Sequence, residues 1–102
     1  MYRQLSRDEA KELLNSGDIL VADVRDEESY RSAHIEGAIH LTMAALQDFC
    51  DQNEKTNPIL LYCYHGISSQ SVAQHLADQG FSEIYSLIGG FEAWNEFSKK
   101  DS

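Results

Sequence analysis

Short apolar runs alternate with segments of helical periodicity along the chain, and this alternation is the feature that most limits the fold. Apolar runs occupy residues 19–22, 59–62 and, with one serine among them, 84–87, and we expect shorter strands at 2–5 and 38–41. Strands that are apolar on both faces are typical of a parallel sheet covered by helices. The sequence therefore predicts an α/β fold, a single domain with a central five-stranded, mainly parallel sheet and helices on both faces.

Two of the expected helices have recognisable signals at their start. Ser6 and the glutamate three residues later have the spacing of a capping box, which predicts a helix from residue 7. Thr42 is expected to cap a second helix over residues 43–52, with Met43 and Cys50 on its apolar face. Both helices would then pack their apolar faces on the sheet.

A cysteine follows the central apolar run and opens the stretch Cys-Tyr-His-Gly-Ile-Ser-Ser at residues 63–69. Residues 69–79 then have helical periodicity, and Gly80 is a typical residue for a helix end. Cys63 thus lies where a buried strand ends, and Gly66 lets the loop curl toward the helix N-terminus. Unpaired N–H groups gather there and favour a thiolate. The sequence predicts an activated nucleophile that acts on an anionic substrate.

Composition limits the partners and the setting. The 102 residues suffice for one domain, residues 1–102, with a frayed tail expected from about residue 98. The net charge of −9 argues against nucleic acid and anionic membranes as partners, so attraction for an anion has to be local. No apolar stretch reaches the length of a membrane span, and the charged N-terminus is no signal peptide. Because two cysteines form no disulfide framework and no zinc-ligand spacing is present, we expect no metal and a cytoplasmic location.

Three stretches together resemble the signatures of the rhodanese family. Asp-Val-Arg at residues 23–25, followed by Tyr30 and His-Ile-Glu-Gly-Ala at 34–38, is similar to the N-terminal signature of that family. The loop at residues 63–68 is similar to its active-site loop, and Gly-Gly-Phe-Glu-Ala-Trp at 89–94 is similar to its C-terminal motif. The three stretches occur in the family's order over nearly the whole chain. One departure is Ser68, which stands where many family loops carry arginine.

The resemblance implies sulfur transfer without a metal or organic cofactor. Catalytic Cys63 would attack the outer sulfur of thiosulfate, release sulfite and retain a persulfide. The residues that would bind the anion are Tyr64, His65, Gly66, Ile67, Ser68 and Ser69. Cyanide or a dithiol protein such as thioredoxin would then take the sulfur, in a ping-pong mechanism. We therefore expect a thiosulfate sulfurtransferase.

Three alternative functions use the same fold. A persulfide carrier charged by a cysteine desulfurase would use the same Cys63, and the sequence does not separate the two sulfur donors. A phosphatase or arsenate reductase of the Cdc25 type needs a Cys-x5-Arg loop, but the sixth residue after Cys63 is Ser69, and no Arg or Lys lies between Asn57 and Phe97. A non-catalytic interaction module typically lacks the cysteine. The sequence therefore favours sulfur chemistry.

Several other residues have simpler structural interpretations. Cys50 is expected to lie in the core, and Asp23 with Arg25 to form a structural ion pair at a strand end. The glycine pair at 89–90 is interpreted as a turn requirement. For His65 the sequence leaves three roles open, which are stabilising the thiolate, holding the substrate and pointing outward.

Overall fold

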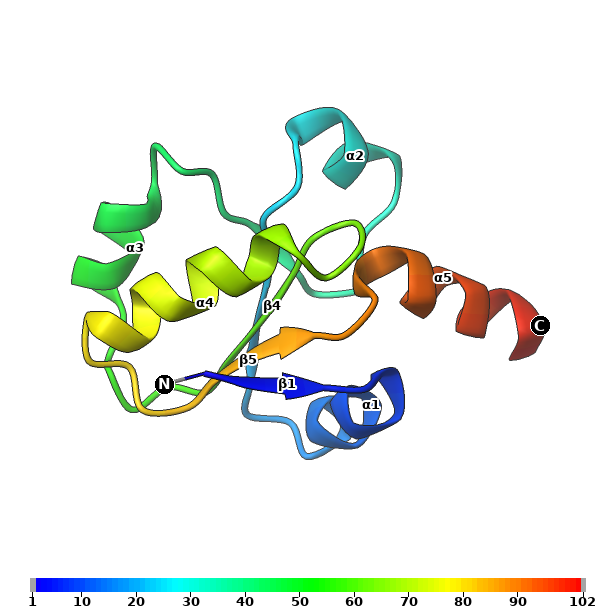
Figure 1. Ribbon diagram of the computed structural model, residues 1–102, viewed down its shortest axis with the longest axis horizontal. Helices are drawn as coiled ribbons and strands as arrows, with labels where there is room; N and C mark the ends of the chain where they lie inside the picture. Colours follow the sequence, from blue (N-terminus) through cyan, green and yellow to red (C-terminus); the bar gives the residue numbers. More distant parts are fainter. Residues whose placement is uncertain (1, 102) are drawn as a thin grey trace.

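The computed structural model describes the backbone of residues 2–101 and the side chains of residues 2–95. Its sheet consists of the strands β1 (Arg3–Leu5), β2 (Leu20–Asp23), β3 (Ile39–His40), β4 (Ile59–Tyr62) and β5 (Ile84–Leu87). The helices are α1 (Arg7–Asn15), α2 (Glu27–Ser32), α3 (Leu46–Gln52), α4 (Ser68–Asp78) and α5 (Gly90–Asp101). The strand order is β1-β5-β4-β2-β3, and every pairing is parallel (Figure 1). The predicted α/β fold with a five-stranded sheet is confirmed.

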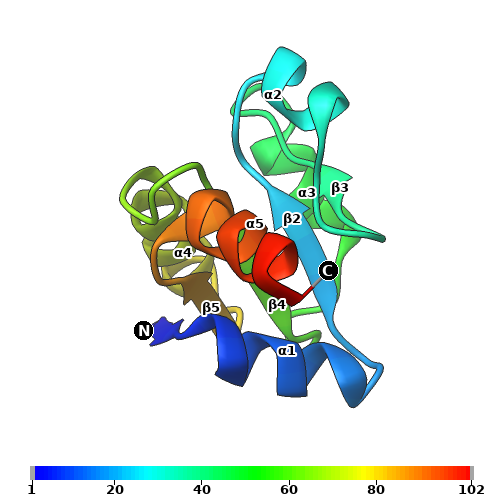
Figure 2. The same cartoon turned by 90° about the vertical axis from the view of Figure 1, so that its right-hand side faces the viewer.

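The sheet separates two apolar cores, because successive strand residues point to opposite faces. On one face, Ile59 and Leu61 of β4 pack with residues of α3 and α4. On the other face, Leu60 and Tyr62 pack with residues of α1 and α5. All four of these β4 residues are fully buried, which explains why this run is uniformly apolar. Helix α2 has no buried residue and projects from the body of the protein at the top of Figures 1 and 2.

Two predicted helix ends have the expected geometry. At the start of α1, the Ser6 hydroxyl accepts a hydrogen bond from the Glu9 N–H at 3.2 Å, while the Glu9 carboxylate accepts one from the Ser6 N–H at 3.0 Å. At the end of α4, the Gly80 N–H donates to Ala77 O, and the Phe81 N–H donates to the Leu76 carbonyl. The second pattern is a Schellman motif, in which Gly80 has a φ of +105°.

The prediction for the start of α3 was wrong. Helix α3 begins at Leu46, and residues 42–45 form a turn closed by a hydrogen bond from the Ala45 N–H to Thr42 O. The Thr42 hydroxyl caps this turn, because it accepts from the same N–H at 3.2 Å. Met43 is therefore not on a helix face, and its side chain is 59% exposed. The core position predicted for Cys50 is confirmed, since that residue is 1% exposed.

The last helix continues through the segment for which we expected fraying. Helix α5 extends to Asp101, and the side chains from residue 96 onward lie outside the described part of the chain. Within residues 2–101, no helix has both the length and the apolar character needed to cross a membrane.

Candidate active site

Cys63 lies directly after β4, at the edge of the sheet where the carboxyl ends of the parallel strands meet. Ligands of open α/β folds bind at this edge. The loop of residues 64–67 curls back over the cysteine and leads into α4. The Cys63 sulfur accepts a hydrogen bond from the Gly66 N–H at 3.1 Å and lies 3.5 Å from the Ser69 hydroxyl oxygen. Because Cys63 is only 5% exposed, these donors act where little water competes.

The surroundings of Cys63 favour its thiolate. Burial alone raises the pKa of a thiol, because it penalises the charged form. Hydrogen bonds from the Ser69 hydroxyl and from the N–H groups of Ser69, Gly66 and His65 oppose this effect. The hydrogen bonds prevail, and the pKa of Cys63 lies below its usual value. The pKa of Cys50 moves in the opposite direction, since burial without such donors raises it.

The glycine pair at residues 89–90 lies against the inner side of the cysteine loop. A β-carbon on Gly90 would meet Cys63 O at 2.5 Å and the Tyr64 carbonyl carbon at 2.6 Å. This close approach lets the Phe91 N–H donate to Cys63 O at 2.8 Å and the Glu92 N–H donate to Tyr64 O at 3.0 Å. The interpretation as a turn requirement was incomplete, because the pair also attaches the loop to the start of α5.

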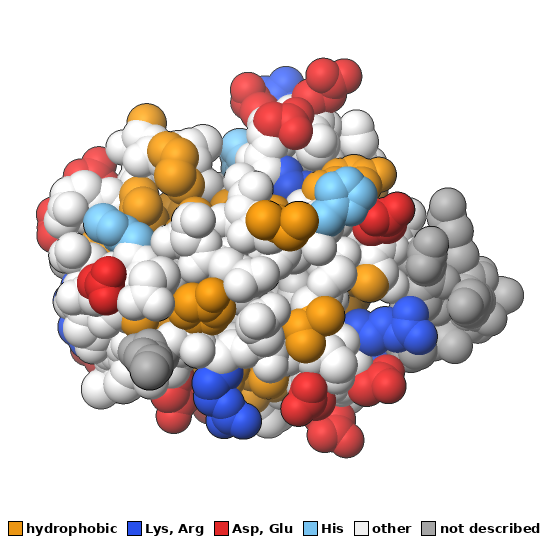
Figure 3. Space-filling model, in the orientation of Figure 1, with side chains coloured by type: hydrophobic (Ala, Val, Ile, Leu, Met, Phe, Trp, Pro, Cys, Tyr) orange, Lys and Arg blue, Asp and Glu red, His pale blue; other side chains and the backbone are white. Residues whose placement is uncertain are grey.

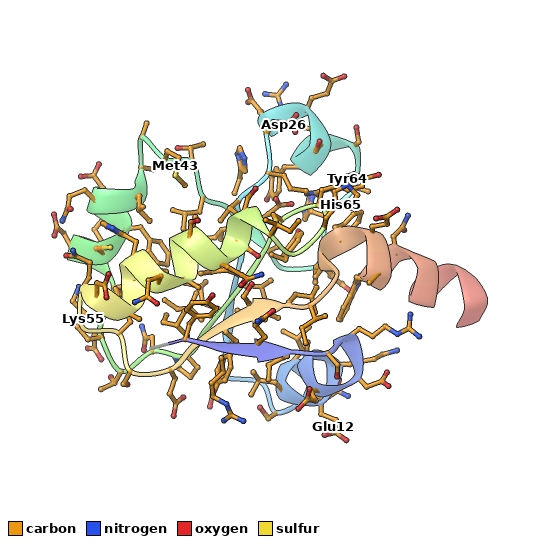
Figure 4. All side chains as sticks on the ribbon, viewed as in Figure 1. Glu12, Asp26, Met43, Lys55, Tyr64 and His65 are labelled. Atoms are coloured by element: carbon orange, nitrogen blue, oxygen red, sulfur yellow. The ribbon has the colours of Figure 1, made fainter. Side chains whose placement is uncertain are left out.

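Most other residues of the loop turn their side chains outward. Tyr64 is 50% exposed and Ile67 is 74% exposed, and Ser68 is exposed as well. The His65 Nδ1 lies 2.7 Å from a carboxylate oxygen of Glu92, which belongs to the first turn of α5. Figure 4 shows Tyr64 and His65 together between α2 and the start of α5. The His65 side chain points outward, and its pairing with Glu92 had no signal in the sequence.

Ser69 differs from the other predicted binding residues because its side chain points inward. It is fully buried, and its hydroxyl oxygen lies 2.8 Å from the hydroxyl oxygen of Ser86 on β5. Ser86 is fully buried too, directly beneath the site. Sequence reasoning missed Ser86. The available signal was a hydroxyl within the otherwise apolar run 84–87, near the carboxyl end of the strand.

Asp23 and Arg25 form the structural ion pair that we expected. The Arg25 Nε lies 3.1 and 3.0 Å from the two Asp23 carboxylate oxygens, and its Nη2 is 2.7 Å from one of them. Asp23 is fully buried and Arg25 is 9% exposed, with its guanidinium 4.2 Å from the centre of the Phe91 ring. Burial disfavours the charged guanidinium, but the Asp23 carboxylate outweighs this and raises the pKa of Arg25. His40 also has a structural contact, with its Nε2 2.6 Å from Arg25 O.

A groove of about 500 Å³ lies beside the loop, between α2 and the start of α5. Its lining includes Tyr64, Asp26, Glu28 and Glu92, so acidic side chains border the site. Figure 3 shows acidic side chains gathered over the projecting α2. Negative charge is therefore favoured at the N–H groups around Cys63, where hydrogen bonds lower the pKa of the thiol. Among the residues that the structure describes, no three His, Cys, Asp or Glu side chains are placed to hold a metal ion.

Comparisons with known proteins agree with this geometry. The rhodanese-like domain family matches residues 6–97. A protein of Coxiella burnetii named thiosulfate sulfurtransferase GlpE is 61% identical over 92% of this chain and 88% of its own length. One of the same name from Shewanella oneidensis is 40% identical over 93% of this chain and 94% of its own. The crystal structure of a rhodanese-like domain protein from Staphylococcus aureus has a TM-score of 0.80 at 27% identity, covering 90% of each chain. The chain belongs to the rhodanese family.

Proposed function

We propose that this protein is a thiosulfate sulfurtransferase in which Cys63 is the nucleophile. The observation that carries the proposal is the Cys63 sulfur, almost buried at the strand end beneath the N–H of Gly66 and beside the Ser69 hydroxyl. These donors favour the thiolate, which is the form that attacks sulfur. The relatives named thiosulfate sulfurtransferase support the same activity.

In the first half-reaction, the Cys63 thiolate attacks the outer sulfur of thiosulfate. A bond forms between Sγ and that sulfur, and the sulfur–sulfur bond of thiosulfate breaks. Sulfite leaves with the bonding electron pair, and Cys63 remains as a persulfide. The N–H groups of the loop are positioned to stabilise negative charge on the transferred sulfur as well as on Sγ.

Backbone N–H groups near Cys63 explain how a protein of negative net charge attracts an anionic sulfur donor. The net charge of −9 repels thiosulfate at long range, and no Arg or Lys occurs in residues 58–96. The backbone of Tyr64, His65, Gly66, Ile67 and Ser68, together with the N-terminus of α4, supplies the attraction. Such N–H groups fit a small anion that approaches Cys63 from the exposed side of the loop.

In the second half-reaction, a nucleophilic acceptor attacks the outer sulfur of the persulfide and restores the Cys63 thiolate. Cyanide and a dithiol protein such as thioredoxin are acceptors of this kind. Because both half-reactions share one persulfide intermediate, initial rates should follow a ping-pong pattern. A cytoplasmic location fits this chemistry, because the cytoplasm keeps thiols reduced and both cysteines are free thiols in the structure.

The two free cysteines provide the test. Cys63→Ser should abolish the transfer of sulfur from thiosulfate to cyanide, whereas Cys50→Ser should retain most of it, because Cys50 is a core residue of α3. Double-reciprocal plots for the wild type should give parallel lines. Substantial activity of Cys63→Ser, or lines that converge, would contradict the proposed mechanism.

The alternatives make different predictions at the same site. Arg25, which lines the groove together with Tyr64, is engaged with Asp23, so it offers a phosphate no free guanidinium. A persulfide carrier would form the Cys63 persulfide with a cysteine desulfurase as donor and not with thiosulfate. Offering both donors to the same protein separates carrier from thiosulfate sulfurtransferase.

A further inference from the structure

Ser86 is a buried hydroxyl to which the reaction described above assigns no role. It lies on β5, a strand whose other residues are apolar or aromatic, and it is fully buried. Within the described part of the protein, its hydroxyl is hydrogen-bonded to that of Ser69, with 2.8 Å between the two oxygens. Ser69 in turn lies 3.5 Å from the Cys63 sulfur. The three side chains form a chain of polar atoms that leads from the cysteine into the protein.

The protonation state of Cys63 decides the direction of the hydrogen bonds in this chain. A hydroxyl has one proton to donate and two lone pairs that accept. When Cys63 is a thiolate, its sulfur only accepts, so the Ser69 proton is directed at the sulfur and Ser86 donates to Ser69. When Cys63 is a thiol, Ser69 can accept from it and donate to Ser86. Ser86 must therefore be able to donate and to accept, and a hydroxyl does both.

We propose that Ser86 is a positioning residue that directs the Ser69 hydroxyl toward the Cys63 thiolate. This inference rests on the proposed role of Cys63 as the nucleophile. In the thiolate state both hydroxyl dipoles have their positive ends toward the sulfur, and donation from Ser86 polarises the Ser69 hydroxyl, which strengthens its bond to the sulfur. Ser86 thus stabilises the anion without touching the sulfur or the substrate.

The geometry distinguishes this role from simple packing. The Ser69 hydroxyl oxygen lies at hydrogen-bond distance from both the Ser86 hydroxyl oxygen, at 2.8 Å, and the larger Cys63 sulfur, at 3.5 Å, so Ser86 can hold this hydroxyl while its proton points to the sulfur. The two serines come from α4 and β5, and Ser86 lies three residues before the Gly89-Gly90 pair that attaches the loop. One short segment therefore contacts the cysteine site both through the backbone of the loop and through the hydroxyl chain.

The test is the pH dependence of the alkylation rate of Cys63, followed by mass spectrometry of the Cys63 peptide with iodoacetamide as the probe. Ser86→Ala should raise the pKa of Cys63 by roughly half a unit to one unit, and Ser69→Ala should raise it by at least as much. Because Ser86 acts through Ser69, the change to Ala at 86 should add no further shift when Ser69 is already Ala. Ser82→Ala removes an exposed hydroxyl that does not belong to the hydrogen-bond chain from Cys63 to Ser86, so it should leave the pKa of Cys63 unchanged.

A control for folding and a rescue complete the design. Ser86→Thr keeps the hydroxyl, so it should bring the pKa back toward the wild-type value, and thermal unfolding identifies any variant that is not folded. An unchanged pKa in folded Ser86→Ala would overturn the proposal. A shift of the same size in the Ser69→Ala background would also overturn it. Alkylation needs no thiosulfate, so these outcomes are independent of whether sulfur transfer itself is observed.

Discussion

Substitution of Gly90 by alanine tests whether the glycine pair holds the cysteine loop in place. Gly90 has a φ of +62°. The Cys63 carbonyl oxygen lies only 2.5 Å from the point that a β-carbon on residue 90 would occupy. The atoms that alanine would meet are backbone atoms of Cys63 and Tyr64, which do not rotate away. The loop or the start of α5 must therefore move.

The expected cost follows from two contributions. The left-handed conformation costs alanine about 1–2 kcal/mol. Moving the loop also weakens the hydrogen bonds from Phe91 N–H to Cys63 O and from Glu92 N–H to Tyr64 O, at about 1 kcal/mol each. We expect Gly90→Ala to lose about 3–4 kcal/mol of stability, which lowers the melting temperature by at least about 12 °C. Displacement of the loop should also reduce sulfur transfer on the order of 100-fold.

Gly37→Ala is the matched control for backbone strain. Gly37 also has a positive φ, +85°, but no atom lies within 4 Å of its missing β-carbon. This variant should lose only about 1–2 kcal/mol and keep its activity. Thermal unfolding and the cyanide assay measure both effects. If Gly90→Ala were no less stable than Gly37→Ala and fully active, the close approach of the glycine pair to the loop would have no functional meaning.

Three further predictions concern the ion pair, the thiol and the phosphatase alternative. Asp23→Asn leaves Arg25 buried without its carboxylate partner and should lower the free energy of unfolding by about 3 kcal/mol. Glu27→Gln breaks the exposed pair with Arg31 and should lower it by less than about 0.5 kcal/mol. Equal losses in chemical unfolding would contradict the structural role of the buried pair. Because hydrogen bonds lower the pKa of Cys63 and the thiolate is the reactive form, its alkylation rate should be half-maximal below the pH of about 8.5 at which an ordinary thiol is half ionised; a midpoint at or above that pH would refute the argument. The protein should not hydrolyse an aryl phosphate, and turnover that depends on Cys63 would overturn the assignment to sulfur chemistry.

Local patterns predicted the elements that position the site. The strands at 59–62 and 84–87 have the predicted bounds, and their side chains are buried or half-buried on both faces of the sheet. The capping box at Ser6 and the helix end at Gly80 were also predictable, because the residues that form each motif are near neighbours in the sequence. The position of Cys63 at a strand end followed directly from these elements.

Contacts between distant segments were not predictable from local patterns. The approach of Gly90 to Cys63 O and the pairing of Ser69 with Ser86 join residues 17 or more positions apart. In the sequence, a glycine pair that only forms a turn cannot be told from one that also lets another backbone segment approach closely. The prediction for the start of α3 failed for a different reason, because the Thr42 hydroxyl can cap a turn as well as a helix.

Intact-protein mass spectrometry after incubation with thiosulfate tests the central claim most directly. Wild-type protein and Cys50→Ser should each gain the mass of one sulfur atom, and cyanide should remove it. Cys63→Ser should gain nothing. A sulfur adduct on Cys50, or no adduct on the wild-type protein, would contradict the assignment of Cys63 as the residue that carries the sulfur.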